Sequence, residues 1–173
     1  LFMGEEWGAS TPWQFFTSHP EPELAEATAK GRKAEFARMG WDESLVPDPN
    51  DPATFERSKL DWTELERGDH ARLLELYRRL ARLRRDRADL TDPRVASRAA
   101  TSIEVPGVAG SGGRRYELQR GRARVLVNLS DEPWTVRLGA GEEVWLATAE
   151  TDAGEAGVVV PRDAAVIVGP AEA

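Results

Sequence analysis

The chain has 173 residues, 40% of them hydrophobic and 31% charged, so it can form one folded domain or at most two small ones. It is too short for a whole (β/α)8 barrel, which needs ~250 residues. Its net charge of −7 argues against a nucleic acid partner, because binding to a phosphate backbone depends on an excess of Lys and Arg.

Cysteine is absent and histidine occurs twice, which excludes disulfides and thiolate chemistry and leaves no motif for a metal or another cofactor. No apolar run approaches the ~20 residues of a membrane span, so we expect no membrane contact. The first residues also lack the charged and cleavable pattern of a signal peptide. We therefore expect a cytoplasmic protein; its oligomeric state is not indicated by the sequence.

Residues 1–4 form a short apolar run, Leu-Phe-Met, closed by Gly4. Such a run is typical of a strand buried on both faces, as in a parallel sheet, and an ordinary edge strand is the alternative. Glu5 and Glu6 follow it directly. Side chains of successive strand residues point to opposite faces, so at most one of the two carboxylates can face a site, and they cannot act together as the acid and nucleophile of a glycosidase.

Residues 1–69 are rich in aromatic and acidic side chains, with all five Phe, four of the six Trp, and 15 acidic against 7 basic residues. Trp7, Trp13, Phe15 and Phe16 alternate with hydroxyl and amide side chains. Sugar sites use this mixture, because flat apolar rings cover the C–H faces of a pyranose while polar groups bind its hydroxyls. The alternative is that these aromatic side chains form a hydrophobic core.

Two helices are predicted in the first half of the chain. The first spans residues 23–39, with prolines at its entrance and Gly40 just beyond its end, although the interior Gly31 weakens it. The prolines of residues 41–61 exclude a long helix or a central strand there. The second helix spans residues 69–87, with Asp69 as its N-cap and leucines at three- and four-residue steps.

The other face of the second helix carries seven arginines, which could suggest a nucleic acid or an anionic membrane as partner. We favour a structural explanation. Arginines in the last turns complement the helix dipole, and their stems cover neighbouring apolar surface. No aromatic stacking platform accompanies them.

After Asp92 and Pro93 the composition shifts to valine, glycine and short alternating runs, which predicts a domain boundary between residues 92 and 93. The glycine-rich residues 107–113 have no Lys-Ser/Thr and are predicted as a hairpin loop, not a phosphate site. Short strands separated by turn signals are typical of an antiparallel sandwich. The predicted strands are residues 101–105, 115–119, 123–129, 135–138, 144–147, 157–160 and 164–168.

Five segments resemble those of a known family: Leu-Phe-Met-Gly-Glu-Glu-Trp-Gly at 1–8, Ser-Thr-Pro-Trp-Gln-Phe-Phe-Thr-Ser-His at 10–19, Gly-Arg-Lys-Ala-Glu-Phe at 31–36, Val-Pro-Asp-Pro at 46–49 and Thr-Phe-Glu-Arg-Ser-Lys-Leu-Asp-Trp at 54–62. They closely resemble the carboxyl-terminal third of the malto-oligosyltrehalose trehalohydrolases, which belong to the alpha-amylase group of glycoside hydrolases. The resemblance covers residues 1–90, whereas residues 93–173 match mainly as a final β domain of suitable length.

The resemblance implies an α+β fragment: residues 1–92 would be the last strand and helix of a catalytic (β/α)8 barrel with a loop and helix excursion, and residues 93–173 an antiparallel β-sandwich domain. It implies hydrolysis of the alpha-1,4 bond that joins trehalose to a maltooligosaccharide. The catalytic Asp, Glu and Asp of the family would precede residue 1, so no catalytic role falls within this chain, and the isolated chain is expected to be inactive.

Six residues are predicted to contact the maltooligosyltrehalose or maltooligosaccharide substrate: Glu6, Trp7, Trp13, Phe15, Phe16 and Arg32. Arg32 and Lys33 could reach sugar hydroxyls, but ordinary surface charges describe them equally well, and Arg57 and Lys59 share this ambiguity. A different class of function stays open, in which the sandwich is a complete non-enzymatic module that binds carbohydrate or protein.

Overall fold

The computed structural model describes residues 1–94, 98–104, 114–154 and 156–171, with the backbone alone for 98–104. The chain forms two compact units, Leu1–Glu75 and Leu76–Ala173. This division falls upstream of the domain boundary predicted between residues 92 and 93, and that boundary stays a prediction.

Residues 1–4 form a turn, so the predicted strand at this position is wrong. The turn leads into a 3-10 helix, η1 (Glu5–Trp7), and the amide of Glu5 donates to the carbonyl oxygen of Phe2 at 3.0 Å. A parallel strand needs hydrogen bonds from neighbouring strands, and no described strand pairs with this segment. Gly4 has φ +82°, and a Cβ there would lie 2.7 Å from that of Ala9, so the turn requires glycine.

The first predicted helix is confirmed as α1 (Pro22–Arg38), and Gly40, with φ +80°, follows it in the left-handed conformation. Only short helices occupy residues 41–66, as the prolines predict: η2 (Glu43–Leu45), α2 (Pro52–Arg57) and η3 (Trp62–Glu66). Each begins after an aspartate whose carboxylate accepts a backbone N–H two residues on, at 2.8, 2.8 and 2.9 Å.

The second predicted helix is confirmed as α3 (Gly68–Asp86), followed by the short α4 (Ala88–Thr91). The predicted N-cap is wrong, because the helix begins at Gly68 and Asp69 lies within its first turn. None of the helices in the described ranges is long and apolar enough to cross a membrane.

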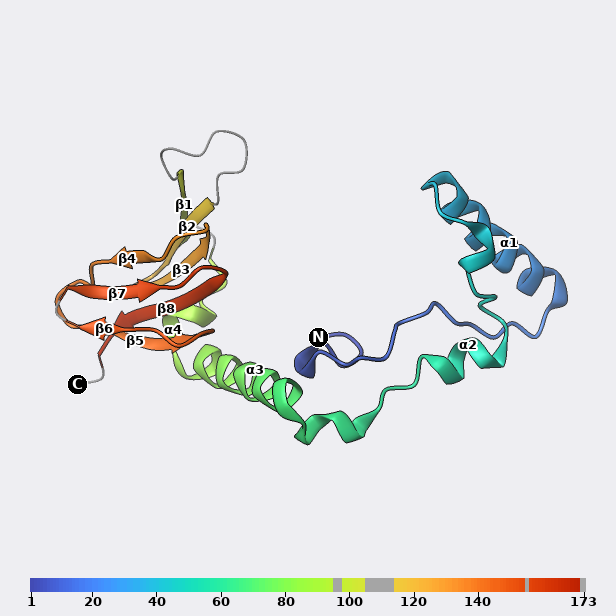
Figure 1. Cartoon of the computed structure of the whole chain (residues 1–173), viewed down its shortest axis with the longest axis horizontal. Coiled ribbons are helices and arrows are strands. Elements are labelled where there is room, and N and C mark those ends of the chain that lie inside the picture. Colours follow the sequence, from blue (N-terminus) through green and yellow to red (C-terminus); the bar gives the residue numbers. More distant parts are fainter. Residues whose placement is uncertain (95–97, 105–113, 155, 172–173) are drawn as a thin grey trace. The chain divides into compact units, whose positions relative to one another are not determined.

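The second half forms the predicted antiparallel sandwich (Figure 1). One sheet has the order β1-β2-β3-β8-β5 and the other the order β4-β7-β6. Every predicted strand lies within three residues of an observed one; the two-residue β6 was not predicted, and the hairpin loop predicted at residues 107–113 lies outside the described residues. The bounds are β1 (Arg98–Glu104), β2 (Arg114–Arg120), β3 (Ala123–Leu129), β4 (Trp134–Val136), β5 (Glu142–Ala147), β6 (Ala153–Gly154), β7 (Gly157–Val160) and β8 (Ala164–Pro170).

The sandwich is held by a hydrophobic core between its sheets: Leu126, Val136, Val158, Val160, Val166 and Val168. The close pairing of β4 and β7 within the three-stranded sheet depends on Gly157, since a Cβ there would lie 2.2 Å from the carbonyl oxygen of Val136. Asn128 is fully buried, and its amide nitrogen donates to the carbonyl oxygens of Glu132, Val160 and Pro161 at 2.9, 3.0 and 3.1 Å. This side chain therefore ties β3 to the end of β7.

Candidate functional site

The segment of residues 10–19 runs extended, and residues 49–64 lie against it in the opposite direction (Figure 1). The hydroxyl of Thr11 donates to the carbonyl oxygen of Lys59 at 3.3 Å, and the amide of Gln14 donates to the hydroxyl of Ser58 at 3.2 Å. Farther along, the amide of Thr17 donates to the carbonyl oxygen of Pro49 at 2.8 Å. These bonds hold most of the predicted aromatic cluster on one well-defined stretch of backbone.

Trp7 is a core residue, as the alternative explanation of the aromatic side chains predicts, because only 2% of its surface is exposed. Its indole lies against that of Trp62, with ring centroids 5.1 Å apart, and its carbonyl oxygen is 2.8 Å from Nδ1 of His70. Its indole nitrogen is buried without a hydrogen bond to any described residue. Burial leaves Trp7 no surface with which to contact a sugar in this structure, so the predicted wall must be built from the other aromatic residues.

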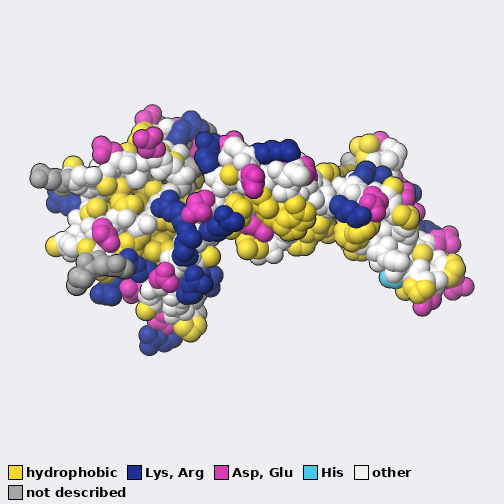
Figure 2. All heavy atoms as spheres, turned by 90° about the horizontal axis from the view of Figure 1, so that it is seen from below, with side chains coloured by type: hydrophobic (Ala, Val, Ile, Leu, Met, Phe, Trp, Pro, Cys, Tyr) yellow, Lys and Arg dark blue, Asp and Glu magenta, His cyan; other side chains and the backbone are white. Residues whose placement is uncertain are grey.

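Trp13, Phe15 and Phe16 keep exposed or half-buried faces. Trp13 is 49% exposed and meets Phe2 edge to face at 5.4 Å. Phe16 packs edge to face on Phe55 of α2 at 5.1 Å, so it links the extended segment to that helix. Hydrophobic side chains are accordingly visible at the surface of the molecule in Figure 2. These three residues stay predicted substrate contacts.

Arg32 lies between two aromatic rings. Its guanidinium carbon is 5.0 Å from the ring centroid of Phe15 and 4.7 Å from that of Phe36, and its Nη1 is 2.8 Å from Glu35 Oε2. The spacing of Arg32, Glu35 and Phe36 along α1 is that of neighbours on a helix face, a signal that sequence reasoning could have used. The guanidinium held in this way fixes Phe15 against α1. The predicted contact of Arg32 with sugar hydroxyls stays a prediction.

Glu6 lies half-buried in η1 instead of on a strand. The argument that places Glu5 and Glu6 on opposite faces therefore does not apply, because successive residues of a 3-10 helix are separated by about 120°. The carboxylate of Glu5 accepts the amide of Phe2 at 3.1 Å, which ties it to the turn. Glu6 stays the predicted polar contact of this segment.

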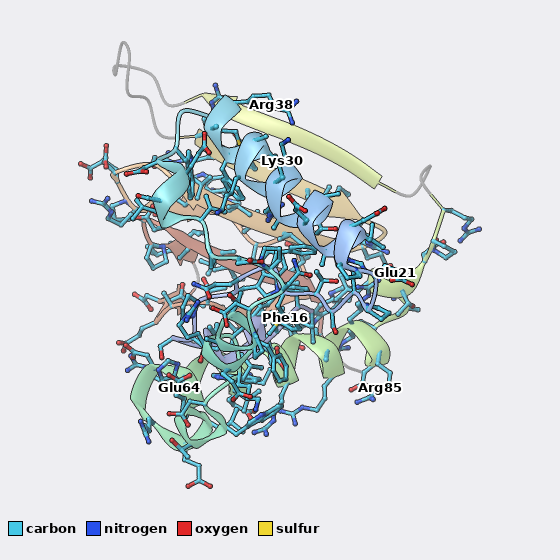
Figure 3. All side chains as sticks on the ribbon, turned by 90° about the vertical axis from the view of Figure 1, so that its right-hand side faces the viewer. Phe16, Glu21, Lys30, Arg38, Glu64 and Arg85 are labelled. Carbon is cyan, nitrogen blue, oxygen red and sulfur yellow. The ribbon has the colours of Figure 1, made fainter. Side chains whose placement is uncertain are left out.

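Glu64 was not singled out by the sequence, yet it is the one buried acidic residue among the described side chains. It lies on η3 (Figure 3), and its carboxylate accepts both the hydroxyl and the amide of Ser10, the latter at 3.2 Å. Hydrogen bonding from Ser10 lowers the pKa of Glu64 from its ordinary value despite the opposing effect of burial. Glu64 is therefore an ionised carboxylate buried next to the aromatic cluster.

A hollow of about 480 Å³ lies between α1 and η2, lined by Glu26, Ala29, Lys30, Lys33, Ala34 and Glu43. Figure 3 places Lys30 midway along α1, between Glu21 at its start and Arg38 at its end. The mixed charges mark it as an ordinary helix surface. Among the described residues no cluster of three or more His, Asp or Glu could hold a metal ion.

Comparison with curated proteins gives a consistent result. The chain is 53% identical over 169 residues to the malto-oligosyltrehalose trehalohydrolase of Brevibacterium helvolum, covering 96% of this chain and 27% of that protein. It is 52% identical over 168 residues to that of Arthrobacter ramosus, covering 97% and 27%, and 57% identical over 133 residues to that of Rhizobium sp. strain M-11, covering 77% and 21%. The chain belongs to the malto-oligosyltrehalose trehalohydrolase family.

The chain corresponds to a carboxyl-terminal segment of these trehalohydrolases and spans about a quarter of their length. No family model matches it. A crystal structure of a Salmonella typhimurium protein assigned as an alpha amylase superposes on 98% of this chain and 27% of that one, with a TM-score of 0.65 and 27% identity. The fold of this trehalohydrolase segment is therefore that of an alpha-amylase-like protein, with helices followed by an antiparallel β-sandwich.

Proposed function

We propose that this chain forms part of a glycoside hydrolase that cleaves the alpha-1,4-glucosidic bond next to the trehalose unit of maltooligosyltrehalose and so releases trehalose. The observation that carries the proposal is the identity of 53% to a trehalohydrolase over nearly the whole chain. Trehalose formation in the cytoplasm is part of the proposal, and the absence of cysteine is compatible with that compartment.

The geometry supports a contribution to substrate binding. Trp13 and Phe15 expose 49% and 37% of their surfaces, and both lie on the extended segment that hydrogen bonds to residues 49–64 hold in place. An exposed ring on a fixed backbone can pack on the C–H face of a glucose unit without a large loss of side-chain entropy. We assign the substrate-facing role to Trp13, Phe15 and Phe16, with Arg32 holding Phe15 and Glu6 offering a polar group.

The bond cleavage itself needs a general acid for the leaving oxygen and a carboxylate for the oxocarbenium-like transition state. We expect the family's three catalytic carboxylates outside residues 1–173. The role of this chain is then to bind and orient the sugar, and the isolated chain should release no trehalose.

A chimera tests this function. Residues 1–173 replace the matching segment of the Arthrobacter ramosus trehalohydrolase, and release of trehalose from maltooligosyltrehalose is measured. We expect a folded, active chimera, whereas the 173-residue chain alone is inactive. A chimera that melts cooperatively but releases no trehalose would contradict the proposal. The proposal would also be contradicted if the sandwich alone bound maltooligosaccharides and the presence of the first unit made no difference to that binding.

The wall residues are tested in the same chimera by Trp13→Ala. We expect KM to rise roughly tenfold, which corresponds to the loss of about 1.4 kcal/mol of binding. Trp41→Ala is the matched control, because Trp41 is 62% exposed but packs on Phe36 at the end of α1 instead of lying on the extended segment. Equal effects of the two substitutions would remove the assignment of Trp13 to the substrate wall.

A further inference from the structure

We propose that Glu64 and His70 are positioning residues that clamp the segment from Trp7 to Ser10 and thereby fix the substrate-binding aromatic side chains that follow it. The proposal rests on the function proposed above and concerns two residues that the sequence did not single out. Both lie in Leu1–Glu75, Glu64 on η3 and His70 in the first turns of α3.

Glu64 holds the carboxyl-terminal end of the segment. Its carboxylate accepts two hydrogen bonds from a single residue, Ser10, through the backbone amide at 3.2 Å and through the hydroxyl. Hydrogen bonds to an ionised group are shorter and stronger than neutral ones, and Glu64 is only 5% exposed, so water competes weakly for them. The backbone at Ser10 is therefore fixed in both position and direction.

His70 holds the other end through the carbonyl oxygen of Trp7, which lies 2.8 Å from Nδ1. A carbonyl oxygen only accepts, so Nδ1 must carry the proton and donate it. This geometry assigns the Nδ1–H tautomer to neutral His70. Because Nδ1 also carries a proton in the imidazolium form, the bond persists in either charge state.

The segment needs to be held at both ends, because the glycine between the held residues has more backbone freedom than any other residue type. Gly8 adopts φ +63° between the two held residues, and the Trp7 indole is enclosed by Trp62 and Gly4. Trp13 and Phe15 follow Ser10 within five residues on the extended segment. A displaced Ser10 would move their rings, and displacement of a binding group by about 1 Å can cost up to a hundredfold in rate.

The geometry is tested in the 173-residue chain labelled with 5-fluorotryptophan, whose Trp7 signal is assigned with Trp7→Phe. We expect Glu64→Gln to shift the Trp7 fluorine resonance more than that of Trp134 or Trp145. Glu66→Gln is the matched control, since Glu66 lies exposed on the same 3-10 helix and the substitution removes the same charge. A Trp7 resonance unmoved by Glu64→Gln would overturn the clamp.

The tautomer is tested by nitrogen-15 NMR of the two histidines at a pH where both are neutral, with His70→Asn used for assignment. We expect His70 to be protonated at Nδ1. Protonation at Nε2 would mean that Nδ1 does not donate to Trp7, and the proposal would be lost.

The link to function is tested in the active chimera. We expect Glu64→Gln and His70→Leu each to lower kcat/KM on the order of tenfold, because the rings that bind the transition state are misplaced. His70→Asn should keep most of the kcat/KM that His70→Leu loses, because the Asn amide nitrogen can replace Nδ1 as donor. Leu has a similar shape but no donor. Glu66→Gln should leave kcat/KM unchanged.

The outcomes separate the clamp from the function. If the unsubstituted chimera is inactive, the proposed function fails while the two NMR experiments still judge the geometry. If the Trp7 resonance moves but kcat/KM does not, or if His70→Asn and His70→Leu behave alike, the two residues are structural only and the positioning role is wrong.

Discussion

At the scale of single residues, Arg124 on β3 shows how the sandwich stabilises a charge that is mostly removed from water. Its guanidinium lies 2.6 Å from Glu142 Oε2 and 3.4 Å from Glu117 Oε1, and the Arg124 and Glu142 side chains are 15% and 17% exposed. Burial disfavours the ionised Glu142, but hydrogen bonds from Arg124 and from the Gly139 amide outweigh it, so the pKa of Glu142 lies below its ordinary value of 4.5.

The lowered pKa predicts a pH dependence that Glu142→Gln should remove. A carboxyl group with a depressed pKa in the folded state contributes stability above its unfolded pKa and loses it as the pH falls through the folded one. We expect Glu142→Gln to cost about 1 kcal/mol of unfolding free energy at pH 7 and to cost progressively less below pH 4.5. Urea denaturation of the sandwich at pH 7 and pH 3 measures both values.

Glu143→Gln serves as the control for this prediction, because Glu143 is the exposed neighbour of Glu142 on β5 and loses the same charge. It should change the unfolding free energy by less than about 0.5 kcal/mol at either pH. A Glu142→Gln cost that is independent of pH would show that ionisation of this carboxyl contributes nothing to the fold.

At the scale of elements, α1 is a helix with no buried side chain, so its own backbone propensity matters more than packing. Gly31 lies in its interior with open space around the position of a Cβ, and Gly40 lies beyond its end with equally open space but φ +80°. Substitution to alanine should therefore change the stability of the helix in opposite directions at the two positions. The backbone conformation alone decides the direction.

We expect Gly31→Ala to stabilise α1 by about 1 kcal/mol, because alanine loses less backbone entropy in a helix. Gly40→Ala should destabilise the helix end by a similar amount, since alanine is strained in the left-handed region. Amide hydrogen exchange of the residues of α1 measures both: exchange should slow about fivefold with Gly31→Ala and quicken with Gly40→Ala. A change of the same sign in both variants would contradict the argument.

At the scale of the whole molecule, buried apolar side chains are distributed unevenly between the two compact units. In Leu76–Ala173 the described core includes Leu126 and five valines, whereas Trp7 is the sole buried large hydrophobic residue among the described side chains of Leu1–Glu75. Among the described side chains, ten of the eleven large hydrophobic residues that are exposed lie in the first unit, the other being Leu129. Burial of apolar surface is the main stabilising contribution to folding, so the units should differ in stability.

Hydrogen exchange of the chain should therefore show two levels of protection. We expect the amides of β3 and β8 to exchange only through unfolding of the sandwich, while those of α1 and α2 exchange much faster through local opening. Val166→Ala should lower the protection of β3 and β8 by about 2 to 4 kcal/mol and leave that of α1 unchanged. Loss of protection in all elements together would show that the units unfold as one.

Local signals predicted the helices and the sandwich strands well. Gly40 and the leucine spacing of residues 73–83 predicted α1 and α3 to within two residues at each end, because a helix is closed by hydrogen bonds between residues four apart. The aspartates before the short helices act in the same local way. The prediction of Asp69 as the N-cap was wrong because the helix already begins at Gly68.

The candidate site was less predictable. The aromatic pattern did not distinguish Trp7, which is 2% exposed, from Trp13, which is 49% exposed. Glu64 and His70 gave no signal at all, since their partners Ser10 and Trp7 lie 54 and 63 residues away in the sequence. Whether a side chain is buried depends on which distant segment packs on it.

The sequence by itself determined the family, the order of helices followed by strands, and most of the helix and strand bounds. The tertiary structure alone decided that Trp7 is buried and that Glu64 holds Ser10. The physical reason is the range of the interactions involved. Helix hydrogen bonds, caps and glycine conformations are set by neighbouring residues, whereas strand pairing, burial and buried ionic contacts require partners that are distant along the chain.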